Sequence, residues 1–324
     1  MTSTVLVTGG AGFIGAYVTR RLIADGWRVV VYDANPVGNV LTMLMPDAAD
    51  RAAISIASGA ITDRTRILDL CRQHKVTAAV HLASPLTQDV TARPAEGIAD
   101  ICLGTAAVFG AAREAGLRRV IWASSVAVFG ARSGYPPGPV GDDACHRPPS
   151  LYGSCKSLCE TLARRAFEVD GLDVVGLRLS VVYGAGRLRG YMSYPSHLLR
   201  SAASGEPVHI PWGRQRLHWQ YVEEVADMVA ATLAPETAGA GRTFNAAGDC
   251  RSWSDLAAVL KTARPDLTVS VEDAVDPVLA DVAEDYDASA LFEACGYAMR
   301  WPLEKAVPDA LDTYATMLRA AATH

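Results

Sequence analysis

Several features that would mark other classes of protein are missing from this chain of 324 residues. Lysine and arginine total 30 against 35 acidic residues. They form no cluster of the kind that follows a phosphate backbone, which argues against a nucleic-acid partner. No apolar run is expected to reach the length of a membrane-spanning helix, and no signal-peptide pattern precedes the first expected strand. We therefore expect a cytoplasmic protein with no membrane partner.

The cysteines lack the spacing of a metal site or of a disulfide framework. Seven cysteines are present without any C-x-x-C pair. Cys155 and Cys159 are one helical turn apart, but no histidine partner adjoins them. Reduced thiols are therefore expected, and no metal site.

The clearest signal that is present is a glycine loop close to residue 10. Residues 4–7 are an apolar, β-branched run that predicts a buried strand. Residues 16–26 have apolar side chains at helical spacing, and residues 28–33 predict a second strand. Between the first strand and the helix lie Gly9, Gly10, Gly12 and Gly15. In this order of strand, glycine turn, helix and strand, G-x-G-x-x-G predicts dinucleotide binding.

Each part of the loop has a physical role in holding a pyrophosphate. Gly9 allows the sharp turn, Gly12 lets the phosphates approach the backbone, and Gly15 lets the helix pack closely. Amide hydrogens at the helix N-terminus then face the phosphates. Asp33 ends the second strand, where a carboxylate accepts hydrogen bonds from the adenosine ribose and repels a 2′-phosphate. Because residues 34–35 supply no arginine, we expect NAD rather than NADP.

Strand and helix patterns alternate through the first half of the chain. Further strands are expected at 76–83, 119–125 and 174–183, and helices at 104–115 and 151–169. This alternation implies right-handed crossovers. It predicts an α/β fold, a doubly wound Rossmann parallel sheet with helices on both faces.

A smaller C-terminal substrate-binding domain is expected after residue 183, where arginine, proline, tyrosine and tryptophan become frequent. The NAD-binding domain is predicted to comprise residues 1–183 and roughly 215–247. The smaller domain is predicted to comprise residues 184–214 and 248–324.

Three local predictions concern the second half of the chain. Glu223 and Glu224 are expected at a solvated helix start, where the helix dipole favours acidic side chains. Residues 278–286 predict a loop and a short strand. The last helix is expected at 303–321, with a break near Pro308.

A second group of residues carries acid/base chemistry. Tyr152 and Lys156 are four positions apart, so on a helix they share one face. A tyrosine with a pKa of about 10 is a poor base at neutral pH, but a neighbouring ammonium favours its phenolate. Such a tyrosine can take a proton from an alcohol or return one to a carbonyl. Ser125 or Ser124, at the carboxyl end of an expected strand, can orient the reacting oxygen.

Over nearly its whole length the chain resembles the extended short-chain dehydrogenase/reductase family, in its sugar-epimerase/dehydratase branch. The segments that resemble that branch are 8–15 (T-G-G-x-G-F-I-G), 81–84 (H-L-A-A), 124–130 (S-S-x-x-V-Y-G), 152–160 (Y-G-x-S-K-x-x-x-E), 178–184 (R-x-x-N-V-Y-G) and 221–225 (Y-V-D-D-V). The resemblance implies that Ser125 is the catalytic serine, Tyr152 the acid/base and Lys156 a ribose ligand.

The resemblance also implies the cofactor contacts and the assembly. Besides the glycine loop, the implied NAD contacts are Phe13, Ile14, Asp33, Ala60, Ile61, Leu82, Ala83, Ser84, Tyr152 and Lys156. Ala60 and Ile61 take the place of an Asp-Ile/Leu pair that faces adenine in the family. The helices at 104–115 and 151–169 correspond to an intersubunit four-helix bundle, so a homodimer with twofold symmetry is expected.

The chain also departs from the branch at positions that bear on its substrate. In the branch, an R-D-F segment carries an arginine that binds the diphosphate of a nucleotide sugar. The corresponding residues of this chain, 217–219, are Leu-His-Trp, and Val181 replaces an asparagine of the branch. Residues 126–127 are Val-Ala where dehydratases have Asp-Glu, so dehydration is disfavoured. Ile101 replaces an asparagine near the nicotinamide half. The arginines available to replace the lost diphosphate contacts are Arg187, Arg189, Arg214 and Arg216.

The residues expected to contact substrate are Ser84, Val126, Arg187, Tyr191 and His218. Of these, His218 is equally consistent with a position outside the pocket. Tyr191, with Tyr194 and Trp212, is more consistent with the core of the smaller domain than with a ligand cage. For His81, at the end of an apolar strand, we favour a structural role.

The predicted function is NAD-dependent interconversion of a secondary alcohol and a ketone on a polar small molecule, such as a sugar or sugar acid. The lost diphosphate contacts favour this dehydrogenase. The alternative is a sugar or nucleotide-sugar epimerase that retains its NAD, because it would use the same catalytic residues. A more remote alternative is a regulator that senses NAD without turnover, against which the intact Ser125, Tyr152 and Lys156 argue.

Overall fold

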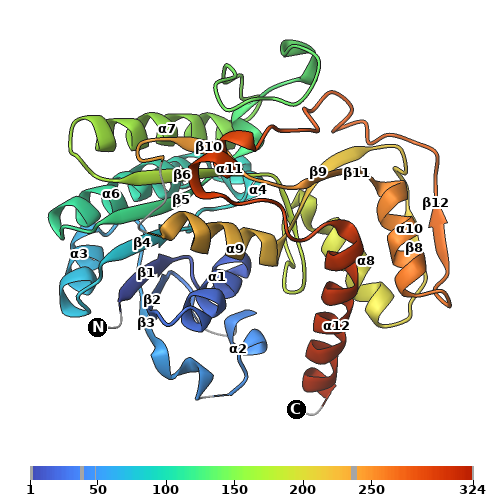
Figure 1. Ribbon diagram of the computed structural model, residues 1–324, viewed down its shortest axis with the longest axis horizontal. Coiled ribbons are helices and arrows are strands. Elements are labelled where there is room, and N and C mark those ends of the chain that lie inside the picture. The colour runs from blue at the N-terminus through green and yellow to red at the C-terminus, as the bar shows by residue number, and fades with distance from the viewer. Residues whose placement is uncertain (1–2, 37–39, 48, 235–238, 323–324) are drawn as a thin grey trace.

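A seven-stranded parallel sheet forms the centre of the protein (Figure 1). The computed structural model describes residues 3–36, 40–47, 49–234 and 239–322. The strand order is β10-β6-β5-β4-β1-β2-β3, and each neighbouring pair is parallel. The strands are β1 (Thr4–Thr8), β2 (Arg28–Asp33), β3 (Ile54–Ser58), β4 (Ala78–His81), β5 (Arg119–Ser125), β6 (Val174–Leu179) and β10 (Thr243–Asn245).

Helices cover both faces of this sheet because its strands are apolar on both sides. Val5 and Val7 belong to one buried cluster and Leu6 to another, as the alternation of a strand requires. The first face is covered by α1 (Phe13–Ala24) and α9 (Val222–Leu233). The second face is covered by α3 (Arg64–Gln73), α6 (Gly104–Glu114) and α7 (Leu151–Glu168). The predicted doubly wound fold is therefore confirmed.

One long helical segment corrects the expectation that no apolar run is long enough to span a membrane. The helix α5 (Pro94–Ile98) continues through a π-helical turn (Ala99–Leu103) into α6. Length and composition alone would allow Pro94–Glu114 to cross a membrane, and 56% of its most apolar window is buried inside the protein. The π turn contacts α7, and α6 packs against α3, as a core helix does.

The single strand expected at 174–183 is two strands that belong to different sheets. β6 ends at Leu179, and β7 (Val181–Tyr183) pairs with β9 (Arg216–Tyr221). Between them the backbone N–H of Ser180 donates to Oε1 of the Gln220 side chain, at 2.8 Å. That side-chain bond replaces a ladder bond, so the chain leaves the central sheet at Ser180.

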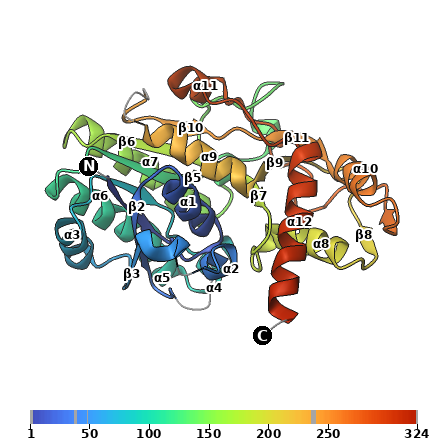
Figure 2. The same cartoon turned by 60° about the horizontal axis from the view of Figure 1, so that its bottom comes forward.

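The second part of the molecule holds the smaller sheets and the C-terminal helix, as the view in Figure 2 shows. β9 lies between β7 and β11 (Asp249–Ser252), and β8 (Val208–Ile210) pairs with β12 (Val269–Val271). Its larger helices are α8 (Tyr194–Ala203), α10 (Trp253–Ala263) and α12 (Leu303–Ala322). Among the described residues, the remaining α-helices are α2 (Val40–Leu44), α4 (Thr87–Ala92) and α11 (Ser289–Cys295).

Two expectations for this part were wrong. The helix α12 runs through Pro308 without a break. An interior proline disfavours a helix, but α12 packs against α8 and α10 and buries Val307 and Ala310 on either side of the proline. Residues 278–286 contain no strand, only single bridges of Val282 to Ala131 and of Tyr286 to Val140.

The helix start at Glu223 and Glu224 is present, but Glu224 is not solvated. Its side chain is buried at 1% exposure. It accepts hydrogen bonds from the backbone N–H groups of Arg300 and Trp301 and from the Tyr297 hydroxyl. Glu224 thus fixes the segment that leads into α12, a role that depends on residues more than 70 positions away.

Candidate active site

A cleft of about 720 Å³ lies at the carboxyl ends of the parallel strands. The strand order reverses between β1 and β4, and ligands of such sheets bind outside this switch point. The predicted catalytic and cofactor residues are far apart in sequence, yet all of them line this one cleft. They are Gly9, Gly12, Phe13, Ile14, Gly15, Asp33, Ala60, Ile61, Leu82, Ala83, Ser84, Ser125, Tyr152 and Lys156.

The glycine loop has the close approaches that a pyrophosphate site requires. Gly9 has φ of +71°, and a Cβ there would lie 2.7 Å from the backbone nitrogen of Ala83. A Cβ at Gly15 would overlap the carbonyl oxygen of Gly9. Gly12 is the N-cap of α1 and supplies no side-chain cap, so the first turn of α1 keeps its donors for a ligand. These features fit the diphosphate of a dinucleotide.

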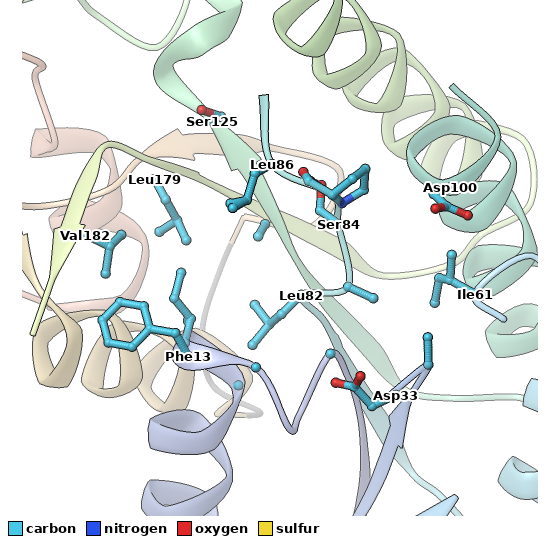
Figure 3. Close-up of a pocket in the computed structure, with 18 of the residues that line it drawn as sticks. Phe13, Asp33, Ile61, Leu82, Ser84, Leu86, Asp100, Ser125, Leu179 and Val182 are labelled. Atoms are coloured by element: carbon cyan, nitrogen blue, oxygen red, sulfur yellow. Dashed lines mark hydrogen bonds between the residues drawn. The ribbon is translucent and has the colours of Figure 1, made fainter. Parts of the chain in front are cut away.

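Asp33 lies where an adenosine ribose would be expected. Its carboxylate accepts hydrogen bonds from the backbone N–H groups of Ala11 at 3.1 Å and Asn35 at 3.0 Å, which fix its orientation. In Figure 3, Asp33 and Ile61 lie toward one end of the cleft, and Phe13 and Val182 toward the other.

Tyr152 and Lys156 enter the cleft from the first turns of α7. Ser150 caps this helix by accepting a hydrogen bond from the backbone N–H of Gly153 at 3.1 Å. Lys156 is buried at 5% exposure. Its ammonium lies 5.7 Å from the centre of the Tyr152 ring and donates to the carbonyl of Ala123 at 2.8 Å. The ammonium is thus held between the end of β5 and the phenol.

Of the two candidate serines, Ser125 has the more available hydroxyl. Ser124 donates its hydroxyl hydrogen to Glu160 Oε1 at 2.7 Å. The Ser125 oxygen accepts from the backbone N–H of Ala127 at 3.1 Å, which leaves its own O–H free to donate. A Cβ at Gly153 would overlap the Ala127 carbonyl, so glycine at 153 brings α7 against the turn that carries Ser125.

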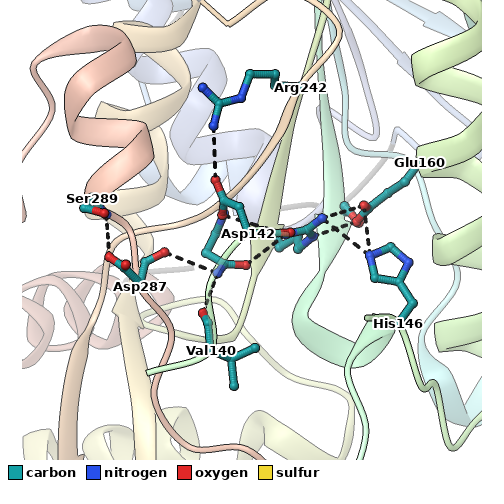
Figure 4. A network of polar contacts seen from close by, with 10 residues as sticks. Val140, Asp142, His146, Glu160, Arg242, Asp287 and Ser289 are labelled. Atoms are coloured by element: carbon teal, nitrogen blue, oxygen red, sulfur yellow. Dashed lines mark hydrogen bonds and ion pairs between the residues drawn. The ribbon is translucent and has the colours of Figure 1, made fainter. Parts of the chain in front are cut away.

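A buried ionic network supports α7 from the side of β6 (Figure 4). Arg178 donates to both carboxylate oxygens of Glu160, at 2.9 and 2.8 Å, and to the carbonyl of Asp142. Burial acts to raise the pKa of Glu160, but hydrogen bonds from Arg178 and His146 outweigh it and hold this pKa at about 2. The network ties α7 to the central sheet and thereby fixes the position of Tyr152.

His81 has the structural role that we favoured. Its Nδ1 and Nε2 lie 2.7 Å from the Thr8 hydroxyl and 3.1 Å from the Thr105 hydroxyl. Burial lowers its pKa to about 3, and the charge of Lys156 acts in the same direction. Its two ring nitrogens are therefore used to join β1, β4 and α6.

The structure separates the five expected substrate residues into two groups. Ser84 and Arg187 line the cleft, whereas Val126, Tyr191 and His218 do not. Val126 packs against a separate apolar cluster. The Tyr191 hydroxyl donates to Asp276 at 2.6 Å. His218 is buried at 3% exposure, with Nε2 lying 3.2 Å from the Ala246 carbonyl.

Several cleft residues were missed by the sequence analysis. Asp100 reaches the cleft because the π turn alters the helical phase there, and Figure 3 places it beside Ile61. A single acidic residue in an apolar helical run was the only signal for it. Leu179, Ser180 and Val182 line the cleft because β6 and β7 divide at Ser180, and nothing in the local sequence announces that division.

The strand order and the cleft define a dinucleotide-binding enzyme fold of the extended short-chain dehydrogenase/reductase type. Residues 5–247 match the NAD dependent epimerase/dehydratase family, and the chain belongs to that family. The predicted family and the predicted NAD cofactor are thereby confirmed.

Relatives with different activities are similar to this chain. D-erythronate dehydrogenase from Cupriavidus necator is 31% identical over 258 residues, which cover 75% of this chain and 76% of that protein. UDP-glucose 4-epimerase from Azospirillum brasilense is 31% identical over 202 residues, which cover 61% of this chain and 55% of that protein. The chain thus spans about half the length of that epimerase.

Solved structures share the fold. UDP-glucose 4-epimerase from Thermotoga maritima, with UDP-glucose, has a TM-score of 0.81 at 22% identity and covers 97% of this chain and 99% of that one. L-threonine dehydrogenase from Cupriavidus necator, in its holo form, has a TM-score of 0.81 at 21% identity, with coverage of 95% and 99%.

Proposed function

We propose that this protein is an NAD-dependent oxidoreductase that interconverts a secondary alcohol and a ketone on a polar small molecule. The observation that carries the proposal is the convergence of Ser125, Tyr152 and Lys156 on the cleft that also contains the glycine loop. Hydroxyl, phenol and ammonium groups next to a dinucleotide site can supply the proton transfer and the polarisation that accompany hydride transfer between an alcohol and a ketone.

In the proposed mechanism the protein moves one proton and fixes one oxygen. NAD, when bound, supplies the acceptor or the donor of the hydride. The Tyr152 phenolate takes the proton of the substrate hydroxyl during oxidation, and the phenol returns it during reduction. The Lys156 ammonium stabilises the phenolate by its charge. The Ser125 hydroxyl donates to the reacting oxygen and keeps it within reach of Tyr152.

The protein residues near the substrate favour a dehydrogenase over an epimerase of nucleotide sugars. Residues 217–219, where the resemblance places a diphosphate-binding arginine, lie in β9, and all three are buried. They offer the cleft no cation. The similarity to D-erythronate dehydrogenase also extends over more of this chain than the similarity to the Azospirillum epimerase.

An epimerase remains the second candidate, because UDP-glucose 4-epimerases are also similar to this chain. An epimerase re-reduces the carbon that it oxidises, so it would invert that carbon without net change in cofactor. A dehydrogenase would release one reduced cofactor for each substrate molecule that is oxidised.

We further propose a homodimer formed through α6, α7 and the preceding π turn. Leu103 and Leu158 are exposed at 61% and 50%, although both are large and apolar. A second copy of the chain would bury them.

We place the protein in the cytoplasm, since all seven cysteines are free thiols. We assign residues 1–183 and roughly 215–247 to NAD binding, and 184–214 and 248–324 to substrate binding, with the small sheet of β7, β9 and β11 spanning the boundary between the two.

The test combines substrate profiling with two variants. Purified protein is offered sugars, sugar acids and nucleotide sugars, and absorbance of the reduced cofactor is followed. Tyr152→Phe is expected to lower kcat on the best substrate about 10²–10⁴-fold with little change in the Kd for NAD. Lys156→Ala is expected to impair both kcat and NAD binding.

Tyr194→Phe is the matched control, because its hydroxyl bonds to the carbonyl of His209 outside the cleft. Near-normal turnover by Tyr152→Phe would refute the proposed mechanism. Inversion of a sugar carbon without cofactor release would establish the epimerase instead.

A further inference from the structure

Three cations line the cleft, and they differ in how their charge is balanced. The Lys156 ammonium donates to the Ala123 carbonyl and lies beside the Tyr152 ring, where its charge favours the phenolate. Arg189 forms an ion pair with Asp89, at 2.9 Å. Arg187 donates to the carbonyl of Val182, and among the described residues no carboxylate lies within ion-pair distance of it.

Arg187 is also partly removed from water and close to the reacting groups. It follows β7 in a loop and is half-buried in the wall of the cleft. Burial lowers the pKa of Arg187 to about 10, while the nearby Tyr152 acts in the opposite direction. The guanidinium is therefore still charged at neutral pH, and it shares its end of the cleft with Tyr152. A half-buried charge without a counter-charge is costly unless a ligand supplies one.

We propose that Arg187 binds a carboxylate of the substrate, so that the substrate is a hydroxy acid and its product a keto acid. This inference rests on the proposed function. A guanidinium presents two parallel N–H donors that match a carboxylate. Ser84, Ser125 and Ser180 line the same cleft and supply hydroxyl groups for the rest of a polyhydroxylated chain.

The distribution of acidic and apolar groups favours a carboxylate over a nucleotide diphosphate. The two carboxylates that line the cleft, Asp33 and Asp100, lie toward the end opposite Val182 (Figure 3). An anionic group beside Arg187 would therefore meet no like charge there. Leu179 and Val182 line the cleft with Arg187, and their side chains carry no charge that would compete for the guanidinium. The diphosphate of a nucleotide sugar is separated from the reacting carbon by the sugar ring, whereas Arg187 lines the same cleft as Tyr152 and lies near enough for their charges to interact.

The first experiment compares acids with matched neutral compounds on the wild-type protein with NAD. The acids are D-glucuronate, D-galacturonate and D-gluconate, and the neutral compounds are D-glucose, D-galactose and D-glucuronamide, with UDP-glucose as the nucleotide sugar. The best acid is expected to exceed every neutral compound and UDP-glucose by about 10- to 100-fold in kcat/KM, the range of a hydrogen-bonded charge pair. Equal or higher kcat/KM for a neutral sugar or for UDP-glucose would overturn the inference.

The second experiment removes the charge. Arg187→Gln is expected to raise KM for the acid about 10- to 100-fold, with a smaller change in kcat. Neutral compounds have no carboxylate to lose, so the fall in kcat/KM for them is expected to be clearly smaller than the fall for the acid. Arg187→Lys keeps the positive charge but loses the two parallel N–H donors of the guanidinium, so an intermediate KM for the acid is expected. Arg66→Gln, an exposed residue of α3 outside the cleft, is the matched control.

Calorimetry on the NAD-loaded protein gives a readout that does not depend on turnover. The acid is expected to bind the wild type, and Arg187→Gln is expected to weaken this binding while the Kd for NAD is unchanged. If Arg187→Gln does not fold, the inference is tested by the KM of Arg187→Lys for the acid and by the kcat/KM of the wild type for D-glucuronate against D-glucuronamide. If Tyr152→Phe abolishes turnover but acids are not preferred, the inference about Arg187 fails and the proposed function stands. If Tyr152→Phe keeps near-wild-type turnover of the best substrate, the proposed function itself fails.

Discussion

The contact between Gly153 and the turn at 126–128 predicts how sharply catalysis depends on the position of α7. A Cβ built at position 153 would lie 2.1 Å from the Ala127 carbonyl oxygen, whereas Cβ atoms essentially never come closer than 3.0 Å to another heavy atom. In Gly153→Ala, α7 and this turn must therefore separate by about 1 Å, a displacement that can cost about 10²-fold in rate when it misplaces catalytic groups. Tyr152 directly precedes Gly153 in α7, and Ser125 directly precedes the turn at 126–128, so the separation would move these two catalytic side chains apart.

We expect Gly153→Ala to lower kcat about 10²-fold on the best substrate, with a much smaller change in the Kd for NAD. NAD binding is largely preserved because the glycine loop and Asp33 belong to other elements. The assay is steady-state kinetics by absorbance of the reduced cofactor, together with calorimetry for NAD.

Gly141→Ala is the matched control, because a Cβ there meets no atom within 4 Å and its backbone conformation does not require glycine. The control is expected to keep wild-type kcat. If Gly153→Ala also keeps kcat within a factor of about three, a difference of less than about 1 kcal/mol in the barrier, the argument from close packing is wrong. A melting temperature near that of the control would show that the loss comes from geometry and not from unfolding.

The other predictions concern cofactor choice, acid stability and assembly. Asp33→Ala combined with Asn35→Arg is expected to lower the ratio of kcat/KM for NAD over NADP by about tenfold, or about 1.4 kcal/mol, and an unchanged ratio would contradict the role of Asp33. Because hydrogen bonding lowers the pKa of Glu160 from 4.5 to about 2, its charge adds about 3 kcal/mol to the free energy of unfolding above pH 4.5, which is lost as the pH falls from about 4.5 to 2. Denaturation curves of Glu160→Gln are expected to show lower stability at pH 7 and no such loss in that window; a stability equal to wild type at pH 7 would refute this. Light scattering at micromolar concentration is expected to give a dimer for the wild type and a monomer for Leu158→Glu, and a monomeric wild type would reject the proposed interface.

The sequence alone was sufficient for features whose physical cause is local. The glycine loop was predictable from the local order of strand, glycine turn and helix, and Gly15 lies where a Cβ would collide with the backbone of Gly9 and Gly10. The spacing of Tyr152 and Lys156 placed them on one face of a helix, and the strand alternation predicted the parallel sheet. Each of these follows from a few neighbouring residues and from the periodicity of helices and strands.

Features that depend on distant partners were decided only by the tertiary structure. The strand at 174–183 divides where the side chain of Gln220, 40 residues away, accepts a hydrogen bond from the backbone N–H of Ser180. Glu224 can be buried because the backbone N–H groups of Arg300 and Trp301 donate hydrogen bonds to its carboxylate. Arg187 lies in the cleft with no acidic partner, a fact that depends on the placement of every carboxylate in the described chain. Local patterns cannot encode these outcomes, because burial and pairing are properties of the packed chain and not of a sequence window.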